Sequence, residues 1–261
     1  MSEIPLGRFI WYELLTDDPE GAQPFYREVV GWGTSEFEGG EMPDEMPYTM
    51  WMNGETPVGG VMQMPDEAKA AGAPPHWLAY VATPDVDETN MKATALGGRV
   101  VNGPLDIPLV GRISIIADPQ GAVFAVFTPV DEVAGHEGPA NVGEFSWHEL
   151  VTSDWESAFD FYSALFGWEK TEAMDMGEMG IYQMFGRNGL TLGGMFTKTP
   201  DMLQPPSWLY YMRVPDVDAA AQKVTALGGS IVKGPMDVPG GDKVVQCMDH
   251  QGVAFALHAS G

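Results

Sequence analysis

Two pairs of residues combine an indole ring with a carboxylate at a spacing that suits a binding or catalytic site. The pairs are Trp11 with Glu13 and Trp147 with Glu149. Each pair lies in a stretch with the alternation of a β-strand, in which residues two apart face the same side. If both side chains face a cavity, the indole can stack on a planar or cationic ligand. The buried carboxyl group, with a raised pKa, can then bind a cation or act as a general base.

A second explanation of these pairs needs no ligand. In it, each glutamate is hydrogen-bonded to backbone groups or to a tyrosine, and each indole fills space. Two tyrosines on later strands are further candidates, although a tyrosine in a strand often belongs to the core or its rim. The candidate catalytic residues are Glu13 and Glu149, and the candidate ligand-binding residues are Trp11, Trp147, Tyr80 and Tyr211.

Histidines offer a different kind of site. Of the five in the chain, His148 and His258 together with Glu149 would supply nitrogen and oxygen donors for a metal ion. The matching positions of the first half hold Tyr12 and Phe127. This candidate metal site therefore exists in the second half only, and scattered histidines that bind nothing remain the alternative.

The elements that position these residues belong to an internal repeat. Gly7, Phe9, Trp11, Tyr26 and Trp32 return as residues of the same type 136 positions later, in the segment 143–168. Such self-similarity over half of a chain indicates two copies of one domain. We expect domains at 1–130 and 143–261, joined by a linker at 131–142 that is rich in Gly, Pro, Ala and acidic residues.

Each copy begins with a strand and a capped helix. Residues 8–15 alternate, which predicts that Phe9, Trp11, Glu13 and Leu15 share one face of a strand. Asp18 before Pro19 predicts the start of a helix, as Asp154 does in the second copy. Gly31 and Gly167 predict the left-handed ends of these two helices.

Three strands follow each helix, and the whole unit then recurs within the same copy. In the first copy the strands are predicted at 32–38, 47–53 and 58–64, and a polar connector spans 65–75. The second unit has a strand from Trp77, a helix from Pro84-Asp85 to Gly97-Gly98, and strands at about 99–103, 111–117 and 122–128. The pairs Gly59-Gly60 and Gly193-Gly194 indicate bulges or close backbone approach.

Charge and composition limit the class of partner. The 261 residues carry a formal charge of −24, which disfavours nucleic acid and anionic membrane surfaces and leaves small molecules as partners. The single cysteine allows no disulfide within the chain, and we find neither a secretory signal nor an apolar run long enough to span a bilayer. We therefore expect a cytoplasmic protein, either a monomer or a homodimer.

At this point the pattern resembles the vicinal oxygen chelate superfamily, which includes glyoxalase I, bleomycin-resistance proteins and extradiol dioxygenases. The resemblance rests on the helix ending in Phe-Tyr-x-x-x-x-Gly-Trp, on Asp-Val-Asp…Leu-Gly-Gly, and on Asp-Pro-Gln-Gly before the last strand. The resemblance covers nearly the whole chain, twice. Within this superfamily, the chain is similar to the tandem glyoxalase-like proteins. It implies an α+β fold of four βαβββ units, forming two domains with cup-shaped mixed sheets.

In that superfamily, His and Glu ligands on the strands of the cup hold a metal ion. The resemblance places the first such position at Trp11 and Trp147, and a second within 58–64 and 190–196, where no His, Asp or Glu occurs. The remaining positions fall on apolar residues, namely Leu78 and Leu209 (or Trp77 and Trp208 if the register slips by one), and Ala125 and Ala256. We therefore predict no cofactor, and a divalent metal is not supported at these positions.

Two hypotheses of function follow. The first is a protein similar to bleomycin-resistance proteins that binds a small organic molecule, aromatic or cationic, in a Trp- and Glu-lined cup. The second is a lyase, isomerase or dioxygenase-like enzyme that uses Glu13 or Glu149 as a base, or a non-standard metal at His148 and His258. A third alternative is a structural module whose cups are filled by their own side chains. Abundant methionine, with a group at 174–195, would suit a hydrophobic ligand.

Overall fold

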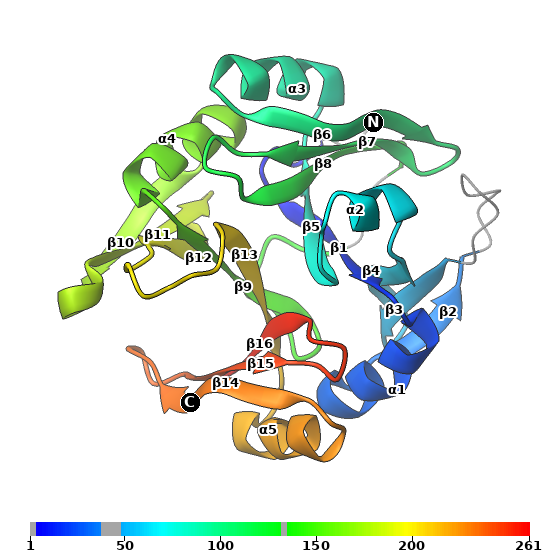
Figure 1. The fold of residues 1–261 in the computed structure, drawn as a ribbon, viewed down its shortest axis with the longest axis vertical. Coiled ribbons are helices and arrows are strands. Elements are labelled where there is room, and N and C mark those ends of the chain that lie inside the picture. The colour runs from blue at the N-terminus through cyan, green and yellow to red at the C-terminus, as the bar shows by residue number, and fades with distance from the viewer. Residues whose placement is uncertain (1–3, 38–47, 132–134) are drawn as a thin grey trace.

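The chain forms two eight-stranded mixed sheets, one from each copy of the repeat, as Figure 1 shows. A computed structural model describes residues 4–37, 48–131 and 135–261. The first sheet has the strand order β2-β3-β4-β1-β5-β8-β7-β6, and the second repeats it as β10-β11-β12-β9-β13-β16-β15-β14. This confirms the predicted α+β fold of four βαβββ units. Parts of the predicted strands 32–38 and 47–53 and of the linker 131–142 lie outside the described residues.

The first sheet joins its two units through β1 and β5, which run antiparallel. Within each unit the last strand returns parallel to the first, as β4 does beside β1. The strands and helices of this half are β1 (Phe9–Thr16), α1 (Pro19–Val30), β2 (Gly33–Glu36), β3 (Thr49–Asn53), β4 (Thr56–Gln63), α2 (Asp66–Ala70), β5 (His76–Ala82), α3 (Val86–Ala95), β6 (Arg99–Ile107), β7 (Gly111–Ala117) and β8 (Val123–Pro129).

The second sheet has the same connections, with β9 and β13 antiparallel at its centre. Its elements are β9 (Phe145–Thr152), α4 (Trp155–Phe166), β10 (Glu169–Asp175), the 3₁₀ turn η2 (Gly177–Met179), β11 (Ile181–Arg187), β12 (Leu190–Thr197), β13 (Ser207–Arg213), α5 (Val217–Ala226), β14 (Ser230–Asp237), β15 (Lys243–Met248) and β16 (Ala254–Ala259).

The predicted helix ends are confirmed. The Asp18 carboxylate accepts a hydrogen bond from the Gly21 backbone N–H at 2.9 Å, and Gly31 ends α1 in the left-handed conformation. Asp154 and Gly167 do the same for α4. The connector 65–75 differs from expectation because it contains the short helix α2, which has no buried residue of its own.

The helix-covered faces of the two sheets pack against each other across the molecule. Figure 1 shows α1 near α5 and α3 near α4, each pair joining the two halves. The Tyr26 hydroxyl of α1 donates to Asp249 at 3.1 Å, and the Tyr162 hydroxyl of α4 donates to Asp118 at 3.0 Å. Many residues that define the repeat, such as Trp32 and Trp168, are therefore buried in cores that both halves share.

One face assignment is corrected by a β-bulge. The pairing of β1 with β5 shifts register between Phe9 and Trp11, so that Phe9 no longer shares a face with Trp11, Glu13 and Leu15. The Phe9 ring instead stacks on His148 with centroids 3.7 Å apart, in the interface between the halves. Trp11 and Leu15 remain together in the hydrophobic cluster on the concave face of the first sheet.

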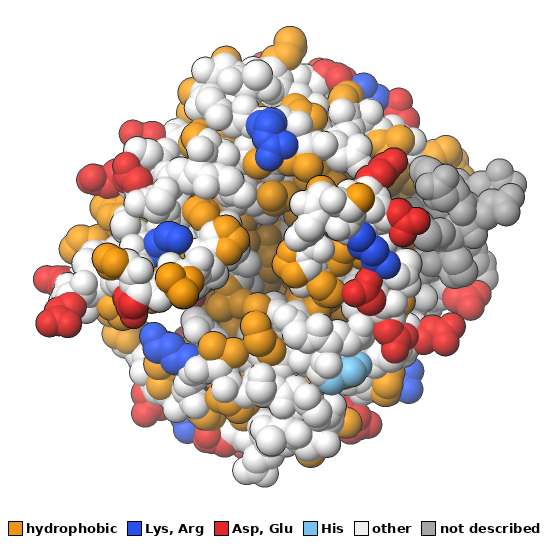
Figure 2. Space-filling view, viewed as in Figure 1, with side chains coloured by type: hydrophobic (Ala, Val, Ile, Leu, Met, Phe, Trp, Pro, Cys, Tyr) orange, Lys and Arg blue, Asp and Glu red, His pale blue; other side chains and the backbone are white. Residues whose placement is uncertain are grey.

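In the described part of the chain, no helix has the length and apolar character needed to cross a membrane. The acidic side chains in the face seen in Figure 2 lie mostly toward its outer edge. The centre of that face is hollowed, and mainly hydrophobic side chains line the hollow.

Candidate functional site

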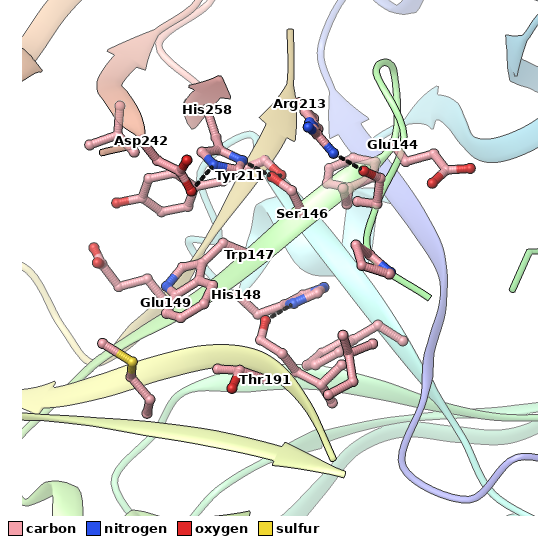
Figure 3. Close-up of a pocket in the computed structure, with 18 of the residues that line it drawn as sticks. Glu144, Ser146, Trp147, His148, Glu149, Thr191, Tyr211, Arg213, Asp242 and His258 are labelled. Atoms are coloured by element: carbon pink, nitrogen blue, oxygen red, sulfur yellow. Dashed lines mark hydrogen bonds and ion pairs between the residues drawn. The ribbon is translucent and has the colours of Figure 1, made fainter. Parts of the chain in front are cut away.

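A cavity of about 600 Å³ opens over the concave face of the second sheet. Figure 3 shows Trp147 and Glu149 projecting from β9 to one side of the strand and His148 to the other. This volume is within the range of ordinary small-molecule sites. Its hydrophobic lining includes Trp147, Met174, Met176, Met184, Met236 and Val244.

The polar floor of this cavity is a hydrogen-bonded chain that starts at Trp147. Its Nε1 donates to the Tyr182 hydroxyl at 2.8 Å, and that hydroxyl donates to the Glu149 carboxylate at 3.0 Å. The Gln246 amide donates to the other Glu149 oxygen at 3.1 Å and to the Tyr211 hydroxyl at 3.0 Å. The site thus brings together the predicted residues Trp147, Glu149 and Tyr211.

Burial decides the electrostatics of this floor. The Glu149 side chain is buried, and the loss of hydration raises the pKa of its carboxyl group above the ordinary value. Hydrogen bonds from Tyr182 and Gln246 and the charge of Lys233 act in the opposite direction and are smaller. A carboxyl group with a raised pKa can both accept and return a proton.

The glycine pair of β12 makes room for this chain. Gly194 is the parallel partner of Glu149, and a Cβ added to it would lie 2.0 Å from the Tyr182 ring. A Cβ on Gly193 would lie 2.0 Å from the His148 carbonyl oxygen. The predicted close approach is therefore present, and at Gly194 it allows the tyrosine of β11 to reach across the strand to Glu149.

The first sheet carries a reduced version of the same chain. Trp11 Nε1 donates to the Tyr48 hydroxyl at 2.8 Å, and the Tyr80 hydroxyl donates to Glu13 at 2.7 Å. The position that matches Gln246 holds Ile115. One buried oxygen of Glu13 consequently has no hydrogen-bond partner among the described residues, and burial raises the pKa of this carboxyl group as well.

The concave face of the first sheet is packed with its own side chains. Leu15, Met64, Leu78 and Tyr80 form a buried cluster there. Ala68 of α2 packs against this cluster, so the short helix covers the place where a ligand would enter. The two cups therefore differ although their sequences repeat. The described cavity covers the second cup and extends to first-half residues such as Ile10, Tyr12 and Val58.

His148 is placed between the halves and away from Glu149. Its Nδ1 lies 2.7 Å from the Leu192 carbonyl oxygen, and its Nε2 lies 2.6 Å from the Tyr12 hydroxyl. Burial lowers the pKa of this imidazole to about 4, so the ring is neutral at neutral pH. Both ring nitrogens are thus engaged by protein groups.

His258 lies in the cavity wall with a different set of partners. Its Nε2 is 3.0 Å from Asp242 and its Nδ1 is 3.0 Å from the Ser146 hydroxyl, as the dashed lines in Figure 3 mark. The structure therefore does not gather His148, His258 and Glu149 around one point. This corrects the candidate metal site, because adjacent residues of β9 face opposite sides of the strand.

Two of the positions that the resemblance assigned to a metal, Trp147 and Ala256, lie in one row across the second cup with Tyr211 between them, whereas the third, Leu209, pairs with Glu149. Trp147 pairs with Tyr211 across β9 and β13, and Tyr211 pairs with Ala256 across β13 and β16. Neither an indole nor an alanine side chain is a metal ligand. Within the ranges 4–37, 48–131 and 135–261, no three His, Cys, Asp or Glu side chains are grouped as a metal site requires.

The mouth of the cavity carries both signs of charge. Arg8, Arg187, Arg213 and Lys233 line it, together with acidic residues such as Glu137. Arg187 pairs with Glu137 of the connecting segment at 2.6 Å. The groove is thus mixed in charge, although the whole chain carries a formal charge of −24.

Four residues of this site escaped the sequence analysis, namely Ser146, Tyr182, Asp242 and Gln246. Tyr182 had a usable signal, because Tyr48 precedes it by 134 positions, the spacing that also separates Gly60 from Gly194. The other three have no counterpart of the same type in the first half, where Ile10, Gly111 and Ile115 stand. Comparing the two copies therefore could not reveal them as repeated features.

Comparison with known proteins gives a match over both halves. The family model described as "Glyoxalase/Bleomycin resistance protein/Dioxygenase superfamily" matches residues 8–126 and 144–257. The chain is 32% identical over 261 residues to "Putative glyoxylase CFP32" of Mycobacterium tuberculosis, covering 98% of this chain and 96% of the relative. It is 28% identical over 268 residues to "Anthracycline biosynthesis protein DnrV" of Streptomyces peucetius, covering 98% and 94%.

Solved structures show the same fold at low sequence identity. The Mn(II)-bound glyoxalase from Novosphingobium aromaticivorans superposes with a TM-score of 0.64 at 16% identity, covering 99% of this chain and 83% of the other. Homoprotocatechuate 2,3-dioxygenase from Brevibacterium fuscum superposes with a TM-score of 0.64 at 17% identity, covering 98% and 81%.

Proposed function

This chain belongs to the glyoxalase/bleomycin resistance protein/dioxygenase superfamily, and from this premise we propose that its second half binds a small organic molecule with a flat, apolar part. The site is the cavity over β9, β13 and β16. Trp147 offers a ring face, and Glu149 with Gln246 offers the polar end. The fold alone does not assign an activity, so the proposal rests on these side chains.

The difference between the two cups is the observation that carries this proposal. The second opens into a cavity of about 600 Å³ that reaches the junction with the first half, whereas the first is packed by Leu15, Met64, Leu78 and the cover of α2. A protein that used both sheets only as structural modules would have no reason to keep one of them open. The two copies of the repeat thus differ in that the cup of the first is filled by side chains and the cup of the second is open.

The lining indicates the class of ligand. Methionine side chains adapt to ligands of varied shape, and Met174, Met176 and Met184 surround the Trp147 side of the cavity. The indole face favours aromatic and cationic groups. The name of the anthracycline biosynthesis relative agrees with a flat aromatic ligand, and it is a reason to test compounds of that kind first.

An enzymatic role for the same site has one specific observation in its favour. Burial raises the pKa of Glu149, as a general base for lyase or isomerase chemistry requires. The substitution Glu149→Gln separates the two roles, because a base is lost while the shape of the side chain is kept. A binding protein would lose affinity, whereas an enzyme would lose turnover with its ligand still bound.

We include in the proposal that this binding uses no metal at the positions inferred from the superfamily. Trp147, Leu209 and Ala256 stand at these positions and offer no imidazole or carboxylate donor, so they do not fit such an ion. Metal analysis of protein purified without a histidine tag tests this point. A near-stoichiometric content of Zn, Ni, Fe or Mn would contradict it.

Calorimetric titration with daunorubicin, a flat and cationic aromatic compound, tests the binding site. We expect Trp147→Ala to weaken binding about tenfold or more, equivalent to about 1.4 kcal/mol. The matched variant Trp11→Ala changes the same residue type in the packed cup and should leave affinity unchanged. Equal losses in both variants would contradict the assignment of the ligand to the second cup.

A further inference from the structure

Ser146, His258 and Asp242 form a continuous hydrogen-bonded chain in the wall of the second cup. The Ser146 hydroxyl is 3.0 Å from His258 Nδ1, and His258 Nε2 is 3.0 Å from Asp242. All three residues line the cavity. This order of hydroxyl, imidazole and carboxylate is the arrangement that activates a serine as a nucleophile.

The proton positions follow from the partners of His258. The hydrogen bond to His258 lowers the pKa of the Asp242 carboxyl group, which therefore stays ionised and accepts the Nε2–H. Nδ1 is then the unprotonated nitrogen, and it can accept the proton of the Ser146 hydroxyl. Here Nδ1 faces the serine and Nε2 faces the carboxylate. The proton transfer is the same with either nitrogen, because each member of a triad is identified by its role as nucleophile, base or orienting acid.

A β-bulge explains how Ser146 comes to face the cavity. The pairing of β9 with β13 shifts between Tyr211 and Met212, which pair with Trp147 and Phe145. Ser146 is the extra residue between them, and a bulge re-aims the side chain at such a position. The Tyr211 carbonyl oxygen is a second acceptor for the Ser146 hydroxyl proton at 3.3 Å, farther away than His258 Nδ1 at 3.0 Å.

A positive charge completes this part of the cavity. Arg213 is the parallel partner of His258 across β13 and β16, so the two side chains are on the same side of the sheet. Its guanidinium group donates to the Ser260 hydroxyl at 2.7 Å, and its charge helps to keep Asp242 ionised. Such a group can stabilise the negative oxygen of a tetrahedral intermediate.

The four residues are a feature of the second copy alone. The matching positions of the first copy hold side chains without a titratable or nucleophilic group, namely Ile10, Ala82, Gly111 and Phe127. A network that only stabilised the fold would be equally useful in both copies. These polar residues instead occur only in the copy whose cup is open.

We infer that the second cup hydrolyses small aryl esters, with Ser146 as the nucleophile and His258 as its general base. Ser146 Oγ forms a bond to the ester carbonyl carbon, the bond to the leaving phenol oxygen breaks, and the serine proton passes through His258 to that oxygen. Water, deprotonated by His258, then attacks the acyl carbon, releases the carboxylic acid and restores Ser146. Asp242 is a positioning residue that fixes the imidazole.

This activity goes beyond the proposed binding function but rests on it, since the aryl group must enter the same cavity. p-Nitrophenyl acetate is the probe. We expect rapid release of p-nitrophenol and an acetyl group on Ser146, located by peptide mass spectrometry. Ser146→Ala and His258→Phe, the latter the residue of the first copy, should slow acylation at least about 10²-fold. Ser230→Ala, an exposed serine of β14, is the control and should match the wild type.

The role of Asp242 has its own readout. Asp242→Asn presents an amide that favours the opposite imidazole tautomer and should slow acylation, whereas Asp242→Glu should restore part of the rate. Calorimetric binding of p-nitrophenol should be unchanged in all these variants. A merely structural carboxylate would lower stability in both variants without this difference in rate.

Two results overturn the inference. One is the absence of an adduct on Ser146 in the wild-type protein, a measurement that needs no variant. The other is equal ester turnover by the wild type and Ser146→Ala. If p-nitrophenol still binds in either case, the binding function stands and only the hydrolytic activity fails.

Discussion

At the scale of single residues, the second cup is built around one buried acid. Glu149 accepts hydrogen bonds from Tyr182 and Gln246, whereas the Glu13 oxygen in the first cup lacks a counterpart of Gln246. Burial is the largest influence on both carboxyl groups and raises the pKa of each. The protein therefore keeps two acids where their ionised forms are disfavoured.

The raised pKa of Glu149 predicts the direction of a pH effect on stability. As pH rises through the ordinary pKa of glutamate, the unfolded chain loses its proton before the folded protein does, so the free energy of unfolding falls. Glu149→Gln removes this decrease in the free energy of unfolding, because glutamine has no proton to lose in this pH range. We expect its melting temperature to exceed that of the wild type at pH 7.5, and the difference to disappear near about pH 4.

Thermal unfolding followed by circular dichroism at both pH values measures this difference. Glu178→Gln, on an exposed turn at the surface of the same half, is the control and should follow the wild type throughout. A lower melting temperature of Glu149→Gln at pH 7.5 would show instead that Glu149 is ionised and held by its hydrogen bonds.

The sequence predicts which residues of β9 face the cavity better than it predicts which residues of other strands contact them. Alternation along β9 placed Trp147 and Glu149 together, and the structure agrees. The tyrosine and the amide that contact Glu149 come from β11 and β15, and no local pattern fixes which residues of distant strands are neighbours. The bulge that directs the Phe9 side chain toward the interface between the halves also escaped the sequence analysis, because this bulge depends on the pairing of β1 with β5.

At the scale of elements, glycine in β12 lets a side chain of one strand cross the next. Gly194 has no side chain to separate the Tyr182 ring from β9. Gly60 of β4 has the same role below Tyr48, where an added Cβ would lie 2.0 Å from the hydroxyl oxygen. The glycine pair is therefore a packing requirement that both copies share.

We expect Gly194→Ala to lower the free energy of unfolding by about 1–3 kcal/mol, the usual cost of overpacking. The added methyl would collide with the Tyr182 ring and displace it from Glu149. Urea denaturation measures the loss. In a Tyr182→Ala background the same change should cost much less, because the ring is gone.

Gly33→Ala is the matched control for this substitution. Gly33 lies in β2, and an added Cβ would find its nearest neighbours 3.9 Å away, an ordinary contact distance. Its stability should change little. A similar loss in Gly33→Ala and Gly194→Ala would point to backbone effects of glycine and contradict the steric explanation.

Element boundaries were predictable where a local signal exists. Asp18 with Pro19, and Gly31 at the other end, fixed α1 because capping acts within a few residues. The helix α2 was missed because its five residues carry no apolar stripe. That helix nevertheless helps to close the first cup, so the functional difference between the copies depended on an element that periodicity does not reveal.

At the scale of the whole molecule, residues at matching positions of the two copies help to join the two halves. Tyr12 and His148 occupy matching positions of the two copies and contact each other, with the hydroxyl 2.6 Å from the imidazole Nε2. The Tyr12 ring also stacks on Phe145 with centroids 3.6 Å apart. Two identical halves would place the same residue twice at this point, so the differing pair favours association of unlike halves.

The buried imidazole at this contact makes the joining of the halves sensitive to acid. The pKa of His148 is lowered to about 4 in the folded protein by burial, so between that value and the ordinary pKa the unfolded chain binds a proton that the folded chain does not. The free energy of unfolding should therefore fall as pH drops from 7.5 to 5, by about 2 kcal/mol from this residue.

Comparison with His148→Gln isolates that contribution. The variant keeps a polar side chain beside Tyr12 but cannot be protonated, so its stability should lack this part of the acid-dependent loss. Urea denaturation at the two pH values gives the difference between the two proteins. If the loss on acidification were the same in both, His148 would already be protonated in the fold, and the Tyr12 hydroxyl would have to accept the Nε2–H.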